Sequence, residues 1–332
     1  MSDGVTGKTT VSALLSQALR AEMARDEKVV VLGEDVGRMG GVFNVTRGLQ
    51  DEFGEWRVRD TPISEMGFVG MGVGLAMAGY RPIVEIMFAD FVGVCLEQIV
   101  NAMAKIPYMS GGQVRMPCVV RTAGGSIGSA AQHSQCLWGM FAHWPGLKVV
   151  APSCPADYHG LLLSAIRSDD PVIFIEHKSQ LNRRADLFQR PDPGRIGDLV
   201  PIGQAAVARS GRDLTIVSIS AAVEWSLAAA EVLATKGIEA EVVDLRSLVP
   251  LDTATVAASA TRTGRLLVVD EDFQSFGMSG EVITRLVEAG VDAQYRRLCM
   301  PDVPLPAAKT LETAVMPSAE KIVAAASDMC GL

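Results

Sequence analysis

Short runs of mostly apolar residues, alternating with helical stretches, constrain the fold of this 332-residue chain more than any other feature. The runs lack the strict polar alternation of a strand with one face in water, which is typical of a parallel sheet covered on both faces. In the first half they are residues 29–32, 83–88, 118–120, 147–150 and 172–175. Strands that alternate with helices imply right-handed crossovers, so the pattern predicts a doubly wound α/β domain.

The segment after the second of these runs has the spacing of a helix. Apolar positions recur at intervals of three and four residues, and Asp90 precedes them as an expected N-cap. The residues on this face are Phe91, Val94, Cys95, Gln98, Ile99, Ala102 and Met103. The sequence therefore predicts a regular helix beginning at Phe91.

A second α/β domain is expected after residue 205. Residues 186–199 are polar and contain Pro and Gly, as in a linker between domains. Apolar runs resume at 214–219, 241–245 and 266–269, with helical stretches at 227–233 and 280–287. We predict a first domain over residues 1–188, a linker over 189–205 and a smaller domain over 206–332.

Composition excludes several classes of protein. A net charge of −8 disfavours a nucleic-acid partner, because phosphate binding needs clustered Lys and Arg. No apolar run reaches the ~20 residues that span a bilayer, and no segment is typical of a signal peptide, so no membrane association and a cytoplasmic location are expected. The six cysteines are scattered without a Cys-x-x-Cys pair, and several lie in apolar runs, so most are expected to be reduced core thiols. A mean hydropathy of +0.24 favours a soluble oligomer that buries apolar surface between subunits.

Four segments together carry a resemblance to a known family. They are Gly-Glu-Asp-Val-Gly at 33–37, Asp-Thr-Pro-Ile-Ser-Glu-Met-Gly-Phe at 60–68, Gln-His-Ser-Gln at 132–135 and Pro-Gly-Leu-Lys-Val-Val at 145–150. In this order and spacing the chain resembles, along nearly its whole length, the β subunits of 2-oxo-acid dehydrogenase first components, including pyruvate, branched-chain and acetoin dehydrogenases. The resemblance implies a thiamine-pyrimidine-binding domain followed by a transketolase-type C-terminal domain, with thiamine diphosphate as cofactor.

Glu65 is the first catalytic candidate. Thiamine catalysis needs a carboxyl group on N1′ of the aminopyrimidine, because that contact favours the imino form that removes the C2 proton. In the family the Glu of the Ser-Glu-Met-Gly segment has this role, and Glu65 stands in that place. The alternative is an ordinary acidic residue at a helix start, favoured there by the helix dipole.

The resemblance assigns three further residues to the site. Phe91 matches the aromatic residue that stacks on the aminopyrimidine, although an aromatic at this place is also typical of a core. His133 matches the active-site His that meets substrate and the acyl-accepting arm, and a His can hold a proton near neutral pH. Glu34 matches an acidic residue in the polar tunnel between two cofactors, or is a loop carboxylate bonded to nearby amides. Of the other histidines, His143 and His177 are expected to be structural and His159 to lie on the surface.

Two cations enter through the resemblance. Some members hold K⁺, and Cys118, Ala165, Ser168 and Asp170 fall at the matching positions, with Ser168 replacing the usual Asp. Mg²⁺ is normally held by Gly-Asp-Gly and a later Asn, which supply oxygen ligands. Here Gly197-Asp198 is followed by Leu199, so the motif is missing. The resemblance assigns it to an α chain, and implies an α₂β₂ heterotetramer with the cofactor between chains.

The resemblance implies an enzyme that decarboxylates a 2-oxo acid, or cleaves acetoin, and passes the acyl group to the lipoyl arm of an acyltransferase. One alternative keeps the cofactor in a carboligase that forms acyloins without a lipoyl partner. Another, from a different class, is a flavodoxin-like binding module. The dense glycines at 67, 70, 72, 74 and 79 favour close helix packing across a subunit interface over phosphate binding.

Overall fold

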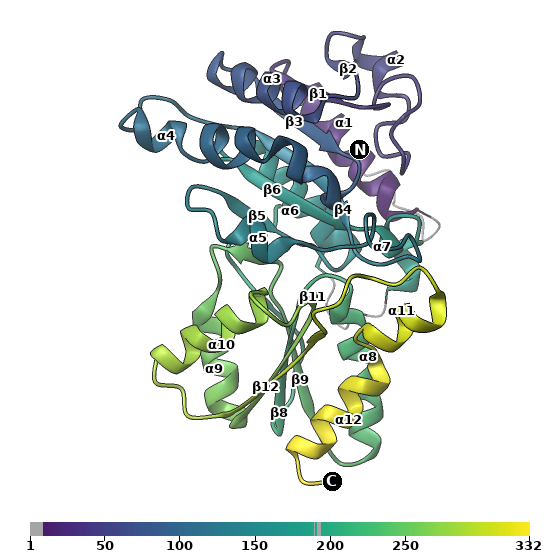
Figure 1. Cartoon of the computed structure of the whole chain (residues 1–332), viewed down its shortest axis with the longest axis vertical. Helices are drawn as coiled ribbons and strands as arrows, with labels where there is room; N and C mark the ends of the chain where they lie inside the picture. Colours follow the sequence, from purple (N-terminus) through teal and green to yellow (C-terminus); the bar gives the residue numbers. More distant parts are fainter. Residues whose placement is uncertain (1–8, 189, 191–193) are drawn as a thin grey trace.

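The computed structural model describes residues 9–188, 190 and 194–332. The chain forms two α/β layers, each consisting of one β-sheet and its helices, which lie one above the other in Figure 1. The first sheet has the order β10-β5-β6-β4-β3-β1-β2 and is parallel except for β10 at its edge. Its strands are β1 (Val29–Gly33), β2 (Val58–Asp60), β3 (Arg81–Ile86), β4 (Val119–Gly124), β5 (Lys148–Val150), β6 (Val172–His177) and β10 (Ser247–Val249). The five strands predicted in this half are confirmed, as is the doubly wound parallel sheet.

Helices cover both faces of this sheet. One face carries α1 (Val11–Arg25) and α6 (Pro155–Arg167), which share an apolar core with Phe174 of β6. The other carries α3 (Glu65–Met77), whose buried side chains Phe68 and Val73 face Val84 of β3. The remaining short helices of this domain are α2 (Leu49–Phe53), α4 (Ile106–Met109), α5 (Trp138–Ala142), α7 (Lys178–Leu181) and η3 (Ala185–Leu187).

The prediction of a regular α-helix beginning at Phe91 is wrong, because the segment forms other types of helix. The segment is a 3₁₀-helix, η1 (Ala89–Cys95), followed by a π-helix, η2 (Gln98–Met103). Phe88 caps η1, and Asp90 lies inside its first turn, where its carboxylate accepts hydrogen bonds from Gln135 instead. Changing the helical period turns Val94 outward, to 57% exposure, while Ile99 and Met103 remain buried. Such irregular turns occur at functional sites more often than elsewhere.

The second sheet confirms the second α/β layer. Its order is β12-β11-β8-β9-β7, parallel except between β7 and β9. The strands are β7 (Ala206–Arg209), β8 (Leu214–Ser218), β9 (Ala240–Asp244), β11 (Arg265–Phe273) and β12 (Gln294–Met300). The helices are α8 (Ala222–Thr235), α9 (Thr253–Thr263), α10 (Met278–Glu288), α11 (Lys309–Val315) and α12 (Ala319–Met329).

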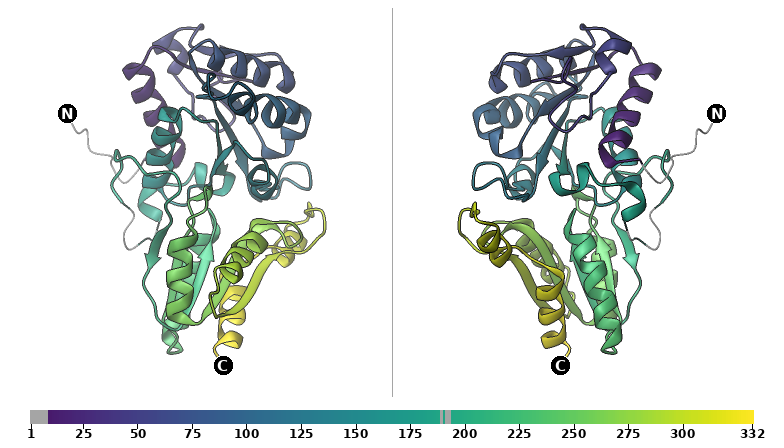
Figure 2. Two further views of the ribbon diagram at one scale, coloured as in Figure 1. Left: turned by 90° about the vertical axis from the view of Figure 1, so that its left-hand side faces the viewer. Right: turned by 90° about the vertical axis from the view of Figure 1, so that its right-hand side faces the viewer.

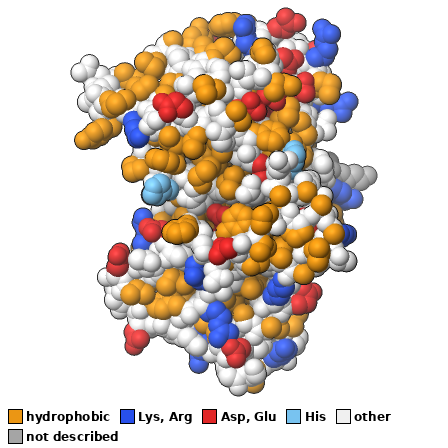
Figure 3. Space-filling view, viewed as in Figure 1, with side chains coloured by type: hydrophobic (Ala, Val, Ile, Leu, Met, Phe, Trp, Pro, Cys, Tyr) orange, Lys and Arg blue, Asp and Glu red, His pale blue; other side chains and the backbone are white. Residues whose placement is uncertain are grey.

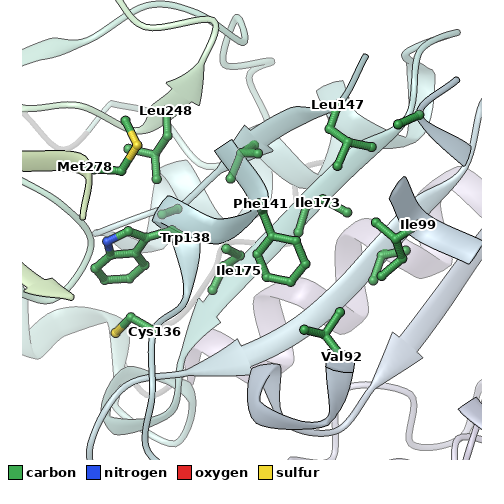
Figure 4. Close-up of a cluster of buried hydrophobic side chains, with 14 of the residues drawn as sticks. Val92, Ile99, Cys136, Trp138, Phe141, Leu147, Ile173, Ile175, Leu248 and Met278 are labelled. Carbon is green, nitrogen blue, oxygen red and sulfur yellow. The ribbon is translucent and has the colours of Figure 1, made fainter. Parts of the chain in front are cut away.

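One apolar cluster joins the two layers. Figure 4 shows Trp138 of α5 and Cys136 before it lying close to Leu248 and Met278 of the second half. The Trp138 indole N–H donates to Asp270 of β11 at 2.8 Å, so the junction also carries a buried polar contact. Two further views show that the teal and green segments of the middle of the chain run through both halves (Figure 2).

Part of the predicted linker is described, and one of its residues binds both layers. Arg190 donates to Asp157 of α6 at 2.7 Å and to Asp244 of β9 at 2.9 Å, and all three side chains are buried. Residues 189 and 191–193 of the linker, like residues 1–8 of the first domain, lie outside the described residues. The boundaries at 188 and 206 remain a prediction.

Burial matches the expectation for the cysteines but not for one histidine. Of the six cysteines, all within the described ranges, Cys95, Cys118, Cys136 and Cys154 are buried and Cys299 and Cys330 are partly buried. His159, predicted to be a surface residue, is only 7% exposed within α6, and burial lowers its pKa. Nearly every residue of this helix is buried, including Leu161, Leu162 and Leu163, which follow His159. Across the described residues, no helix is both long and apolar enough to cross a membrane.

A buried ion network crosses the middle of the first sheet. Arg121 of β4 donates to Glu85 of β3 and to Glu176 of β6, each at 2.6 Å. One guanidinium thus faces two carboxylates, which leaves an excess negative charge in a dry interior. Burial raises the pKa of Glu176 to about 7; Arg121 opposes this shift and the charge of Glu85 adds to it.

Replacing Glu176 with glutamine should therefore flatten the pH dependence of stability. Since the folded pKa of Glu176 lies above the unfolded value of 4.5, the stability from its protonated form is complete below pH 4.5 and is lost as pH rises through about 7. Glutamine mimics the protonated acid, so Glu176→Gln should gain on the order of 1–3 kcal/mol relative to wild type between pH 5 and 8. Thermal unfolding across this range measures the difference. Glu281→Gln, in an exposed pair with Arg285, is the control, and parallel curves for all three proteins would contradict the prediction.

Candidate active site

The four predicted site residues all follow carboxyl ends of strands in the first sheet. Glu34 comes directly after β1, and Glu65 begins α3 after β2. Phe91 lies on η1 after β3, and His133 lies in the loop after β4. Carboxyl ends of parallel strands meet at one edge of a sheet, where open α/β folds bind their ligands. The topology thus gathers side chains that are almost 100 residues apart in the chain.

Glu34 and Glu65 form an acidic pair at this edge. Glu34 is 8% exposed, and its Oε1 has no hydrogen-bond partner among the described residues. Burial raises the pKa of Glu34, and the charges of Glu65 and then Asp35 raise it further. Burial and the Glu65 charge also raise the pKa of the Cys95 thiol, on the helix that carries Phe91, to about 12. Glu65 itself is partly exposed at the first turn of α3, with its carboxylate available to a ligand.

Phe91 and His133 meet in an aromatic group with Phe88. The imidazole of His133 lies edge-on to both phenyl rings, with centroids 5.3 Å from Phe88 and 5.4 Å from Phe91. Phe88 and Phe91 are themselves 5.4 Å apart, also edge to face, the arrangement that aromatic quadrupoles favour. Phe91 and His133 are both partly exposed, so each presents a surface to the outside.

Three residues of this site were missed by the sequence prediction. Phe88 completes the aromatic group, Asp90 holds Gln135 of the His133 loop, and Lys178 donates to the His133 carbonyl. A signal existed for two of them: Phe88 ends the apolar run at 83–88, and Lys178 lies three residues after the run at 172–175, where the carboxyl ends of parallel strands bind ligands.

The carboxyl and aromatic side chains fit the pyrimidine end of thiamine diphosphate, but the described residues include no cluster of oxygen ligands for the Mg²⁺ of its diphosphate end. Within the described residues, the one His, Cys and acidic cluster close enough for a metal is Cys136, His177 and Glu271. All three are buried, and this sulfur-, nitrogen- and oxygen-containing set differs from the oxygen ligands that Mg²⁺ prefers. His177 Nε2 is 2.7 Å from Glu271 Oε2, in agreement with a structural role for this histidine.

The residues at the predicted K⁺ positions already have partners. The Cys118 carbonyl accepts from Val172 N at 3.0 Å, and the Ala165 carbonyl accepts from Ser168 N at 3.2 Å. The Lys148 ammonium contacts the side chains of Ser168 at 3.1 Å and Asp170 at 2.8 Å. A carbonyl oxygen can accept twice, so the potassium ion remains a prediction.

The glycines of α3 divide into two groups. Gly70 and Gly72 pack within the chain, since an added Cβ would lie 3.1 Å from Gln98 and 2.5 Å from Val84. Gly67 and Gly74 instead lie on an exposed face of the helix. The same face exposes Met66, Met71 and Met77. Hydrophobic side chains also gather over the N-terminal half in Figure 3. Gly70 and Gly72 are therefore explained by packing within the chain, and the subunit interface remains a prediction for the outer face of α3.

Both halves of the chain match domain families of transketolases. Residues 7–184 match the family described as transketolase, pyrimidine binding domain, and residues 203–322 match transketolase, C-terminal domain. A solved split-gene transketolase, an inactive β₄ tetramer, superposes with a TM-score of 0.79 at 22% identity, over 97% of this chain and 98% of that one. At this identity the likeness shows the fold alone. The chain has the two-domain fold of a transketolase-type thiamine enzyme.

Curated relatives narrow the class to one family. The chain is 45% identical to the mitochondrial pyruvate dehydrogenase E1 component subunit beta of Drosophila melanogaster, over 97% of this chain and 89% of that protein. It is 42% identical to an acetoin:2,6-dichlorophenolindophenol oxidoreductase subunit beta of Cupriavidus necator, over 96% of each. It is 43% identical to the 2-oxoisovalerate dehydrogenase subunit beta of Bacillus subtilis, over 95% and 96%.

The chain belongs to the family of E1 β subunits of thiamine-diphosphate-dependent 2-oxo-acid and acetoin dehydrogenases. Membership implies an α-subunit partner and assembly into a complex. The carboligase alternative is not favoured by these relatives, and the match of both transketolase domains argues against a flavodoxin-like module.

Proposed function

We propose that this chain is the β subunit of an α₂β₂ enzyme that decarboxylates a 2-oxo acid, or cleaves acetoin, and transfers the acyl group to the lipoyl arm of an acyltransferase. The observation that carries the proposal is the joint placement of Glu34, Glu65, Phe91 and His133 at one sheet edge. These are the four residues that the family resemblance assigned to the site. A cytoplasmic location is part of the proposal where the source is bacterial, since the relatives include mitochondrial proteins.

In this proposal the chain holds the pyrimidine half of thiamine diphosphate. The Glu65 carboxyl group would hold N1′ of the aminopyrimidine, and the Phe91 ring would hold its face. The chemistry supplied by the bound cofactor would be a nucleophilic carbon for a substrate carbonyl. Glu65 keeps the aminopyrimidine in the form that can remove a proton, and the buried Glu34 carboxyl can hold a proton beside it because its pKa is raised.

His133 faces substrate in this arrangement. Its ring is held by two phenyl groups and is partly exposed, so it can donate or hold a proton on the substrate or the incoming acyl acceptor. Mg²⁺ and the diphosphate are assigned to the α subunit, because the oxygen-rich ligand motif is missing from this sequence. The exposed Gly and Met face of α3 is proposed as subunit contact.

Reconstitution tests the function. The chain is co-expressed with the α-type gene adjacent to its own, and the complex is assayed with 2-oxo acids and acetoin and an artificial electron acceptor. Thiamine-dependent reduction of the acceptor by at least one substrate is expected, with none from either chain alone. The Glu65→Gln complex is the control. Formation of an acyloin without reduction of the acceptor would contradict the proposal and indicate a carboligase.

A further inference from the structure

The loop that carries His133 contains no regular secondary structure, so its shape depends on a few anchors. At its start, Gly125 approaches His177 so closely that an added Cβ would lie 2.1 Å from Nε2, and Ser126 N donates to Glu271 at 2.8 Å. Towards its end, Gln135 donates twice to Asp90 Oδ1, from its backbone at 3.2 Å and its side chain at 2.9 Å. Between these ends, His133 itself has a single side-chain anchor on its carbonyl.

That anchor is Lys178. It follows β6 and is 3% exposed, and its ammonium donates to the backbone carbonyl of His133. The same Nζ lies over the ring of Phe88, 5.2 Å from the centroid, and Phe88 also contacts the His133 imidazole. Lys178 therefore restrains both the main chain of His133 and a ring against which its side chain packs.

The charge of Lys178 is balanced locally. Burial lowers its pKa, and the charges of Asp90 and Glu271 oppose that shift, Asp90 more strongly. Burying an ammonium is costly unless it is paired and hydrogen-bonded. A backbone carbonyl can be held equally well by a neutral donor. Core packing alone therefore does not require a buried lysine here. Within the described part of the chain, the hydrogen bond of its ammonium goes to His133, the residue proposed to meet substrate.

We propose that Lys178 is a positioning residue for His133. Its ammonium fixes the His133 carbonyl, and through it the angle at which the imidazole presents itself beside Phe88 and Phe91. Lys178 acts through His133 and does not itself touch substrate. The inference rests on the proposed function for the role of His133, but the geometry it predicts can be measured without turnover.

The first test is spectroscopic. The chain, labelled with ¹³C at histidine Cε1, is assembled with its unlabelled α partner, and His133 is assigned among the four histidines by His133→Asn. Lys178→Met should displace or broaden the His133 resonance, while those of His143 and His159 stay in place. Lys321→Met is the control, since Lys321 also donates to backbone carbonyls but lies in the second domain. Lys178→Gln serves if methionine prevents assembly. An unchanged His133 resonance would overturn the inference.

The second test is a double-mutant cycle in the assembled enzyme. Misplacing a reacting group by ~1 Å can cost roughly 10²-fold, so Lys178→Met should lower kcat by about 10- to 100-fold. In the His133→Asn background the same change should cost less than about twofold, because the residue it positions is absent. Equal losses in both backgrounds would show that Lys178 only supports the fold. If no substrate is found, the proposed function fails, and the resonance of His133 still decides the role of Lys178.

Discussion

Replacing Glu65 with glutamine is expected to lower turnover of the assembled enzyme by about 10²–10⁴-fold, the range of a general acid–base contribution. Glutamine has nearly the same shape and can occupy the first turn of α3, so folding and assembly should be preserved. An amide cannot act as the carboxyl group does at N1′ of the cofactor, so the loss should appear in kcat more than in cofactor affinity.

The matched control is Glu288→Gln, an exposed carboxylate at the end of α10. It should leave turnover within about twofold, as expected for surface changes away from the site. If turnover of the Glu65→Gln enzyme is within a few-fold of wild type, Glu65 is an ordinary carboxylate at a helix start. The acidic pair that it forms with Glu34 would then have no role in catalysis.

The second large effect concerns stability. Arg121→Met should destabilise the folded chain by about 3–5 kcal/mol, because it leaves Glu85 and Glu176 buried without their cation. The loss should be greater at pH 8 than at pH 5, since the pKa of Glu176 is raised to about 7 and its carboxyl group takes up a proton as the pH falls. Denaturant unfolding at the two pH values measures it.

Arg115→Met is the control for this prediction. Arg115 also pairs with a carboxylate, Asp169, but its side chain is 74% exposed, against 2% for Arg121. Exposed pairs contribute about 0–1 kcal/mol. Similar small losses for both variants would mean that the network across β3, β4 and β6 is not what stabilises the centre of the sheet.

The parallel strands were predictable because their pattern is local. Runs such as 172–175 are short and apolar at every position, which is typical of a strand buried on both faces. The two-layer organisation followed from the same signal, repeated after the polar segment at 186–199. The site residues were predictable only through the family resemblance, since nothing near Glu65 or His133 in the sequence indicates that they share an edge.

What was missed depends on contacts distant in sequence. The period of residues 89–103 fits an α-helix, yet Asp90 binds Gln135, 45 residues away, and the chain takes up 3₁₀ and π turns. His159 lies in a helix that is buried nearly all round, which one polar residue cannot reveal. From the sequence alone, Lys178 would be predicted to lie on the surface. Only the fold brings its ammonium to the carbonyl of His133.

Calorimetry can decide whether the cofactor site is divided between two chains. Thiamine diphosphate with Mg²⁺ is titrated into this chain alone, and then into the chain assembled with its α partner. We expect no saturable binding to the chain alone and tight binding to the complex, since the site residues proposed for this chain would hold only the pyrimidine end. Micromolar binding by the isolated chain, dependent on Mg²⁺, would contradict it.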